Sequence, residues 1–203
     1  MDAVFSFFPP DRPANDEPMD DRVPERVPAF EPPSDELAVP IATSTILGRG
    51  DDVVIVLAGA RVHSDGVEFL VDRYLRRGGR DARQWHLIQM DFAGHWGMSL
   101  PGPDRLRFGL ALGNGERLFI DDRFAGSESD EPGGHTLRMT GHGGSGGEDR
   151  YTLHDGLWLW PLPPDGPLEL VVQWPAFGIP ETRAVLDGTE LRSLAGGVRP
   201  IWE

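Results

Sequence analysis

Apolar residues at every second position constrain this chain more than any other feature, because that spacing places them on one face of an extended strand. Two runs show the pattern, with Leu106, Phe108, Leu110 and Leu112 in the first and Leu168, Leu170, Val172 and Trp174 in the second. Asn114 and Gly115 follow the first run, and this dipeptide suits the positive backbone dihedral angles of a hairpin turn. The first run and residues 116–120 are therefore predicted to form an antiparallel hairpin.

Other segments have the same strand character. Residues 52–62 are apolar on both faces, as in a central strand, and residues 67–77 begin with a regular alternation. Further short strands are predicted at 136–141 and 157–160, whereas only residues 187–195 have a helical pattern. We predict an all-β protein, an antiparallel β-sandwich of about seven to nine strands with an immunoglobulin-like build and one short C-terminal helix.

Residues 1–40 differ in composition from the rest of the chain. They hold nine of the 19 prolines, and residues 1–38 carry ten acidic side chains against three arginines. Proline opposes regular elements, and a segment of low hydrophobicity and high charge cannot offset the entropy lost on ordering. The chain is therefore predicted to consist of a disordered, acidic, Pro-rich N-terminal tail (1–40) and a single β-sandwich domain (41–203).

Three phenylalanines, Phe5, Phe7 and Phe8, lie together near the start of this tail. Disordered tails seldom keep several Phe residues together without using them. We expect these side chains to dock into a groove or to add to a sheet edge, on a partner protein or on the chain's own domain. An apolar stretch without a binding role is the alternative.

Composition excludes several classes of chemistry. The chain has no Cys, which excludes disulfides, thiolate metal sites and a catalytic thiol. All 19 basic residues are Arg, which excludes a Schiff-base lysine and a phosphate-loop lysine. A formal net charge of -14 opposes binding to nucleic acid. No apolar run is long enough to insert into a membrane and residues 1–8 do not resemble a secretory signal, so a cytoplasmic location is expected.

The last third of the chain carries a resemblance, in the run LWLWPLPPDGPL at 157–168 and the run VQWPAFGIPETR at 172–183. These runs resemble a group of proteins from high-GC Gram-positive bacteria, in which a Gly-rich run precedes an aromatic-Pro-Leu-Pro-Pro turn and a strand ending in Trp-Pro-Ala. The strands at 52–77 resemble the group more loosely. The resemblance implies common ancestry, and the group supplies neither an assigned activity nor catalytic residues.

Four residues are candidate ligands of a catalytic metal: His135, His142, His154 and Asp155. A catalytic zinc needs three nitrogen or oxygen ligands, so such a site would make the protein a small metal-dependent enzyme on a β scaffold. Asp91 and His95 are spaced as on one face of a helix, but the glycines around them favour a loop. Because no metal-binding signature is present, we expect scattered surface histidines, no metal and no cofactor, with the metal enzyme as an alternative.

Two tryptophans are candidates for a binding surface. Trp158 and Trp160 are two residues apart and project from one face of the predicted strand, with Leu157 and Leu159 on the other. Large aromatic side chains most often fill a core, because each buries about 150–250 Å². A protein interface and a platform for stacking sugar rings are the alternatives, and Trp174 is a further candidate for partner binding.

Positive charge is concentrated beside Gly78 and Gly79, where five arginines occur within eleven residues: Arg73, Arg76, Arg77, Arg80 and Arg83. In an acidic protein such a patch can receive the acidic tail or an acidic partner. A solvated loop is the alternative.

These features favour a non-catalytic protein-binding or assembly module, because no set of residues forms a coherent catalytic constellation. The predicted partner-binding residues are Phe5, Phe7, Phe8, Trp158, Trp160 and Trp174, with the five arginines as the patch for an acidic partner. The partner is expected to be another protein, bound through the tail or a face of the sandwich, and a homo-oligomer is left open. A metal-dependent enzyme and a glycan-binding module remain the alternatives.

Overall fold

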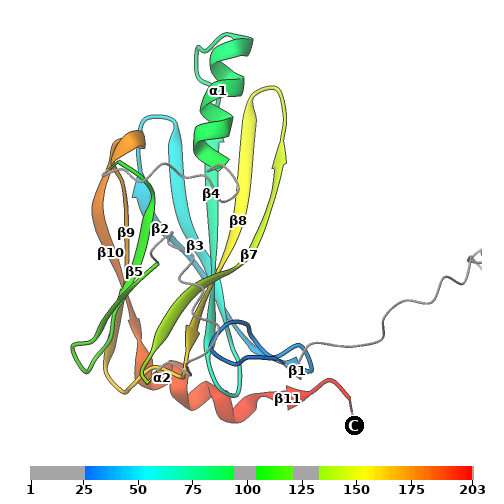
Figure 1. Ribbon diagram of the computed structural model, residues 1–203, viewed down its shortest axis with the longest axis vertical. Helices are drawn as coiled ribbons and strands as arrows, with labels where there is room; N and C mark the ends of the chain where they lie inside the picture. The colour runs from blue at the N-terminus through cyan, green and yellow to red at the C-terminus, as the bar shows by residue number, and fades with distance from the viewer. Residues whose placement is uncertain (1–25, 94–103, 121–132, 203) are drawn as a thin grey trace, which may run out of the picture.

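A computed structural model describes residues 26–93, 104–120 and 133–202 of the chain. Their strands form two antiparallel sheets packed face to face, with a two-stranded sheet at one end (Figure 1). The predicted β-sandwich is therefore confirmed. The predictions for Phe5, Phe7, Phe8 and His95 concern residues outside the described ranges.

The larger sheet has five strands in the order β2-β3-β4-β8-β7. Their bounds are β2 (Val39–Arg49), β3 (Val53–Val62), β4 (Val67–Arg76), β8 (Arg150–Trp160) and β7 (Thr136–Gly146). The smaller sheet has the order β10-β9-β5-β6, with β10 (Ile179–Asp187), β9 (Pro167–Trp174), β5 (Arg107–Ala111) and β6 (Arg117–Phe119). The two-stranded sheet pairs β1 (Glu36–Leu37) with β11 (Arg199–Pro200). The described residues form more strands than the segments predicted: β1 and β11 are too short to show alternation, and β2 and β10 were missed.

The two alternating runs form the strands predicted for them. Leu110 in β5 and Leu170 in β9 lie opposite each other in the ladder and are 2% and 0% exposed. β5 and β6 pair as a hairpin, and Gly115 in its turn has a φ of 86°, a conformation that suits glycine because it has no Cβ. The hairpin prediction is confirmed.

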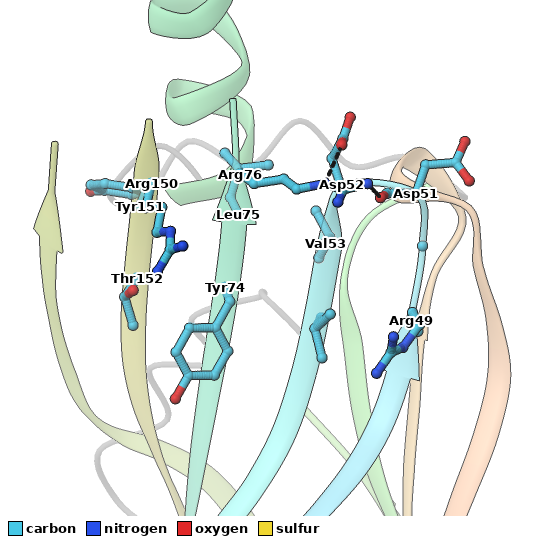
Figure 2. A pocket seen from close by; sticks show the side chains of 12 residues that line it. Arg49, Asp51, Asp52, Val53, Tyr74, Leu75, Arg76, Arg150, Tyr151 and Thr152 are labelled. Carbon is cyan, nitrogen blue, oxygen red and sulfur yellow. Dashed lines mark hydrogen bonds and ion pairs between the residues drawn. The ribbon is translucent and has the colours of Figure 1, made fainter. Parts of the chain in front are cut away.

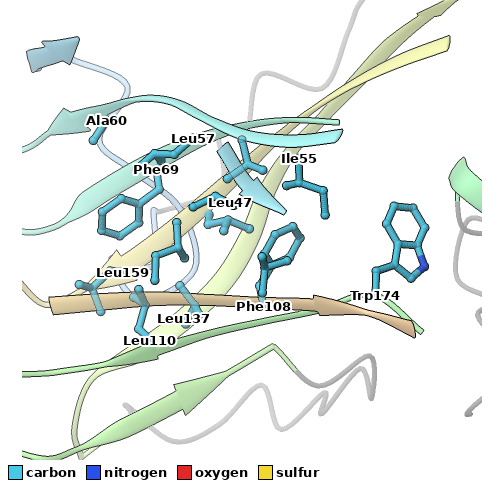
Figure 3. Packing of buried hydrophobic residues seen from close by; sticks show 14 of the residues in the cluster. Leu47, Ile55, Leu57, Ala60, Phe69, Phe108, Leu110, Leu137, Leu159 and Trp174 are labelled. Carbon is cyan, nitrogen blue, oxygen red and sulfur yellow. The ribbon is translucent and has the colours of Figure 1, made fainter. Parts of the chain in front are cut away.

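Inward-facing side chains of both sheets form the hydrophobic core (Figure 3). Ile55, Leu57 and Phe69 of the larger sheet are at most 1% exposed, and Phe108 and Leu110 of the smaller sheet are 2% exposed. Since side chains alternate along a strand, every second residue of the larger sheet faces away from this core. That outer face carries the candidate site.

Two α-helices accompany the sheets, together with the 3₁₀ turns η1 (Pro175–Phe177) and η2 (Ala195–Gly197). α2 (Gly188–Leu194) is the predicted C-terminal helix, and the Asp187 carboxylate caps it by accepting from the backbone N–H of Thr189 at 2.9 Å. Among the described residues, neither α-helix is long and apolar enough to cross a membrane.

The other helix, α1 (Ala82–Ala93), shows that the prediction of a single helix, and of a loop at Asp91, is wrong. Asp81 and Gln84 cap its start reciprocally, because each side chain accepts from the other's backbone N–H, at 2.8 and 3.0 Å. This Asp-x-x-Gln spacing is a capping box, a sequence signal that predicts a helix. Trp85 and Phe92 are the buried residues of α1, which stands at the end of the sandwich beside β4 and β8 (Figure 1).

Residues 26–35, called the strap below, pack against the folded domain although the sequence assigned them to the tail. The Pro28 carbonyl accepts from Trp158 Nε1 at 2.8 Å, and Arg26 forms an ion pair with Asp65 at 2.9 Å. The ordered domain therefore includes residues from 26 onward, and the predicted boundary at residue 40 is corrected. The sequence could not show this, because the strap is ordered by contacts with residues far along the chain.

Candidate functional site

A pocket of about 360 Å³ hollows the outer face of the larger sheet, at the end nearest α1 (Figure 2). It lies where β2 and β4 end and β3 and β8 begin. Its lining includes three arginines, two aspartates and an apolar and hydroxyl-bearing floor: Arg49, Arg76, Arg150, Asp51, Asp52, Val54, Tyr74 and Thr152. We call it the outer-face pocket.

Strand register brings the floor of this pocket together. Arg49 lies opposite Val54, and Val54 lies opposite Tyr74. Tyr74 in turn lies opposite Thr152, so four strands contribute one residue each to a single row. The next residue of β4, Leu75, is 2% exposed in the core, whereas Tyr74 is 42% exposed, so the row faces outward. Only the pairing of four strands creates this surface.

One border of the pocket is a shared ion-pair cluster. The Asp52 carboxylate lies 2.8 Å from Arg76 Nε and 2.7 Å from Arg80 Nη1. Hydrogen bonds from Arg76 and then Arg80 lower the pKa of Asp52. Arg76 therefore has an acidic partner within the protein, which it shares with Arg80.

Arg49 and Arg150 differ from Arg76 in this respect. Both are exposed, and neither has a carboxylate partner among the residues that the structure describes. In Figure 2 they lie on opposite sides of the Tyr74 ring. Two guanidinium groups without a partner carboxylate thus flank an apolar floor, in a protein whose formal net charge is -14.

The Tyr74 ring is held in place by Asp72, which neighbours it on the same face of β4. The Tyr74 hydroxyl donates to Asp72 Oδ2 at 2.9 Å, and His154 Nδ1 lies 2.7 Å from Asp72 Oδ1. Burial, and then the hydrogen bond to Asp72, raise the pKa of the Tyr74 phenol. The phenol therefore stays protonated and keeps its bond to Asp72, which fixes the ring as a platform.

Arg73 is not part of a surface patch, which corrects the prediction for this residue. Its side chain is 4% exposed and lies inside the sandwich, where Nε donates to Asp155 at 2.5 Å and Nη2 donates to Asp155 at 3.0 Å. Nη1 donates to the Phe92 carbonyl of α1 at 2.8 Å. Arg73 alternates with Val71 and Leu75, so it belongs to the inward face of β4. Its role is to attach the end of α1 to the sheet.

The other predicted arginines do not form one surface patch that is open to an acidic partner. Arg76 and Arg80 share Asp52, Arg77 donates to the Arg80 carbonyl at 2.8 Å, and Arg83 is exposed on α1. Of the five, only Arg76 lines the outer-face pocket. The two arginines that matter most, Arg49 and Arg150, were not predicted, because they lie on different strands and no local motif links them.

Two of the three predicted tryptophans are buried. Trp158 is 0% exposed and covered by the strap, and Trp174 is 4% exposed and stacks on Phe92 with ring centroids 5.3 Å apart. Neither indole offers a surface to a partner or a sugar ring, so Trp158 is buried as first expected, and the alternatives of a protein interface and a glycan platform are wrong for it. Trp160 is half-buried at the end of β8.

The described side chains of the predicted metal ligands do not converge, although the pairing of β7 with β8 places His142 opposite Asp155. His154 is 58% exposed on the outer face, whereas the neighbouring Asp155 points inward and is 0% exposed. His135 Nδ1 lies 2.7 Å from Glu116 instead, and the side chain of His142 is outside the described structure. No group of three His, Cys, Asp or Glu side chains within the described ranges could hold a metal ion.

Another histidine, His63, is buried beside Trp158. Its side chain is 7% exposed, its ring meets Trp158 edge-on at 5.5 Å, and Nδ1 lies 3.8 Å from the Glu36 carboxylate. Neither ring nitrogen has a hydrogen-bond partner within the described part of the chain. Burial lowers the pKa of His63, although Glu68 and Glu36 act in the opposite direction. The folded protein therefore favours the neutral ring.

Comparison of the chain with protein-family models, curated proteins and solved structures finds no match. The resemblance of residues 157–183 to a bacterial protein group thus stays a prediction. The functional assignment depends on the geometry of the outer-face pocket.

Proposed function

We propose that this protein is a non-catalytic binding module of the cytoplasm that holds an acidic segment of another protein in the outer-face pocket. The observation that supports this most is the pair Arg49 and Arg150, which have no partner carboxylate among the described residues and flank the floor of Val54 and Tyr74. Guanidinium groups bind carboxylates through two parallel hydrogen bonds. A tyrosine ring beside an aliphatic side chain accommodates an aromatic or aliphatic group.

The sheet sets the spacing that the bound segment must have. Arg49 and Arg150 are separated by three strand spacings and by two residues along β8, hence by roughly 16 Å between Cα atoms. Residues four apart in an extended peptide are separated by about 13 Å. The preferred ligand is therefore a segment with carboxylates at least four residues apart and an aromatic or aliphatic side chain between them.

The proposal keeps the predicted protein partner and the predicted acidic chemistry, and moves the binding surface. The tryptophans and most of the five predicted arginines are replaced by Arg49, Val54, Tyr74 and Arg150. The immunoglobulin-like identity, the cytoplasmic location and self-association stay predictions from the sequence.

A peptide selection tests this function. A library of random peptides is selected on the immobilised full chain, and sequences with an aromatic residue between acidic residues are expected to be enriched. A labelled peptide from the selection is then titrated against Arg49→Glu/Arg150→Glu. Each exposed ion pair contributes about 0.2–1 kcal/mol and each reversal adds a repulsion of similar size, so binding should weaken about tenfold or more.

The matched control is Arg107→Glu/Arg117→Glu, which makes the same charge change on exposed residues of the smaller sheet. It is expected to change the affinity little. Equal weakening by both double variants, or enrichment of basic peptides, would contradict the proposed function.

A further inference from the structure

The same pocket fits a segment of this chain itself. We infer that residues 2–11 occupy the outer-face pocket of their own molecule when no partner is bound, so that the N-terminus competes with the partner. This inference rests on the proposed function, because it uses the same pocket. It is argued from charge, from the order of side chains and from the length of the linking chain.

Charge favours this occupant. Residues 1–25 carry seven acidic side chains against two arginines, and Asp2 and Asp11 border the three phenylalanines. The pocket offers Arg49 and Arg150, whose guanidinium groups have no carboxylate partner in the described ranges. Docking would therefore pair excess negative charge of the chain with positive charge that the domain leaves uncompensated.

The order of side chains also fits. Phe5 and Phe7 are two residues apart, so in an extended segment they project to one side about 7 Å apart. Val54 and Tyr74 lie opposite each other on neighbouring strands, whose spacing is about 5 Å. Two adjacent apolar side chains can thus face two adjacent apolar floor residues. Asp2 precedes Phe5 and Asp11 follows Phe7, which places one carboxylate toward each end of the row.

The linking chain has a suitable length. Arg26 is bound to Asp65 in the turn between β3 and β4, and seven residues of β4 separate Val67 from Tyr74, about 23 Å. Positions 9–25 connect Phe8 to the strap. A flexible chain of that length has a root-mean-square span of about 20–25 Å, and an extended Pro-rich one reaches about 50 Å. The effective concentration of the segment at the pocket is then in the millimolar range.

Competition from the N-terminus lowers the apparent affinity of the partner. If the segment fills the pocket in nine molecules of ten, the apparent affinity falls about tenfold. A partner would have to displace the segment, and a modification that removes negative charge or the phenylalanines would open the pocket. The module would thus carry its own inhibitor.

A spin label on the N-terminal segment tests this directly. The chain has no Cys, so Ser6→Cys gives a single attachment point between Phe5 and Phe7. The expected result is that the backbone amide signals of Val54, Tyr74 and Thr152 lose most of their intensity in the labelled protein. Val185, 68% exposed on β10 of the other sheet, is the control and should keep its signal.

Two further samples make the result specific. Arg49→Glu/Arg150→Glu in the spin-labelled chain should restore the pocket signals, whereas Arg107→Glu/Arg117→Glu should not. A mixture of spin-labelled chains without isotope and isotope-labelled chains without spin label detects docking between molecules, and it should show no loss. A variant in which Ser replaces Phe5, Phe7 and Phe8 should bind a selected peptide about tenfold more tightly, because the competing segment is lost.

Undiminished pocket signals, an equal loss at Val185 and Tyr74, or a loss only in the mixed sample would each overturn the inference. If any of these is found while selected peptides still require Arg49 and Arg150, only the intramolecular competition fails. If the label reaches the pocket but no selected peptide requires these arginines, the intramolecular docking stands, and the proposed function fails together with the competition that depends on it.

Discussion

The ion pair between Arg73 and Asp155 makes a prediction about non-additive effects on stability. Both side chains are at most 4% exposed, and Nε of Arg73 lies 2.5 Å from Asp155 Oδ2. Removing one partner leaves the other charge buried, which costs about 3–5 kcal/mol. A domain is usually stable by about 5–15 kcal/mol, so Arg73→Met or Asp155→Leu alone should remove about a fifth or more of the free energy of unfolding.

The double variant Arg73→Met/Asp155→Leu should be more stable than either single variant. Both charges are gone, and apolar side chains replace them next to Phe92 and Trp174, whose rings lie 5.4 and 5.5 Å from the Arg73 guanidinium. The Phe92 carbonyl loses its hydrogen bond from Arg73, at a cost of about 1–3 kcal/mol. The loss of unfolding free energy in the double variant is therefore expected to be several kcal/mol smaller than the sum of the losses in Arg73→Met and Asp155→Leu.

Urea unfolding followed by tryptophan fluorescence measures these free energies. Trp174 reports on unfolding because its ring centroid lies 4.3 Å from that of Phe177 and the ring packs beside the ion pair. Arg76→Met is the control, since Arg76 is 69% exposed on the same strand, and its loss should stay below about 1 kcal/mol. A double variant destabilised by the sum of the two single losses would refute the reasoning.

Two further predictions concern Trp158 and the histidine beside it. Burial lowers the pKa of His63. The free energy of unfolding should therefore be highest above the ordinary pKa of about 6.5 and should fall as the pH decreases from there through the folded pKa. Urea midpoints compared at neutral and mildly acidic pH should shift less in His63→Phe than in the unchanged chain, and an equal shift would argue against His63 as the origin. Trp158→Phe removes the hydrogen bond to the Pro28 carbonyl, so we expect a loss of about 1–3 kcal/mol and faster tryptic cleavage after Arg26. An unchanged cleavage rate would mean that the strap is held without Trp158.

The strand pattern of this protein can be predicted from its sequence, because alternation is a local property. The alternation of apolar residues predicts the strands at 106–112 and 168–174, and Asp187 caps the start of the predicted C-terminal helix. Local signals also existed for two features that were missed. The Asp81 and Gln84 spacing predicts α1, and the inward position of Arg73 between Val71 and Leu75 predicts its burial.

The outer-face pocket could not be predicted, because it exists only through the register of four strands. Arg49 and Arg150 are about a hundred positions apart. The pairing of β2 with β3, β3 with β4 and β4 with β8 brings them to the two sides of Tyr74. The burial of Trp158 likewise depends on the strap, which is far from it in the chain. By itself the sequence determined seven of the strands, since each residue's face follows from its neighbours, but not β2 and β10. The tertiary structure alone decided which strands meet and which charges remain without a partner, since pairing joins residues that no local pattern connects.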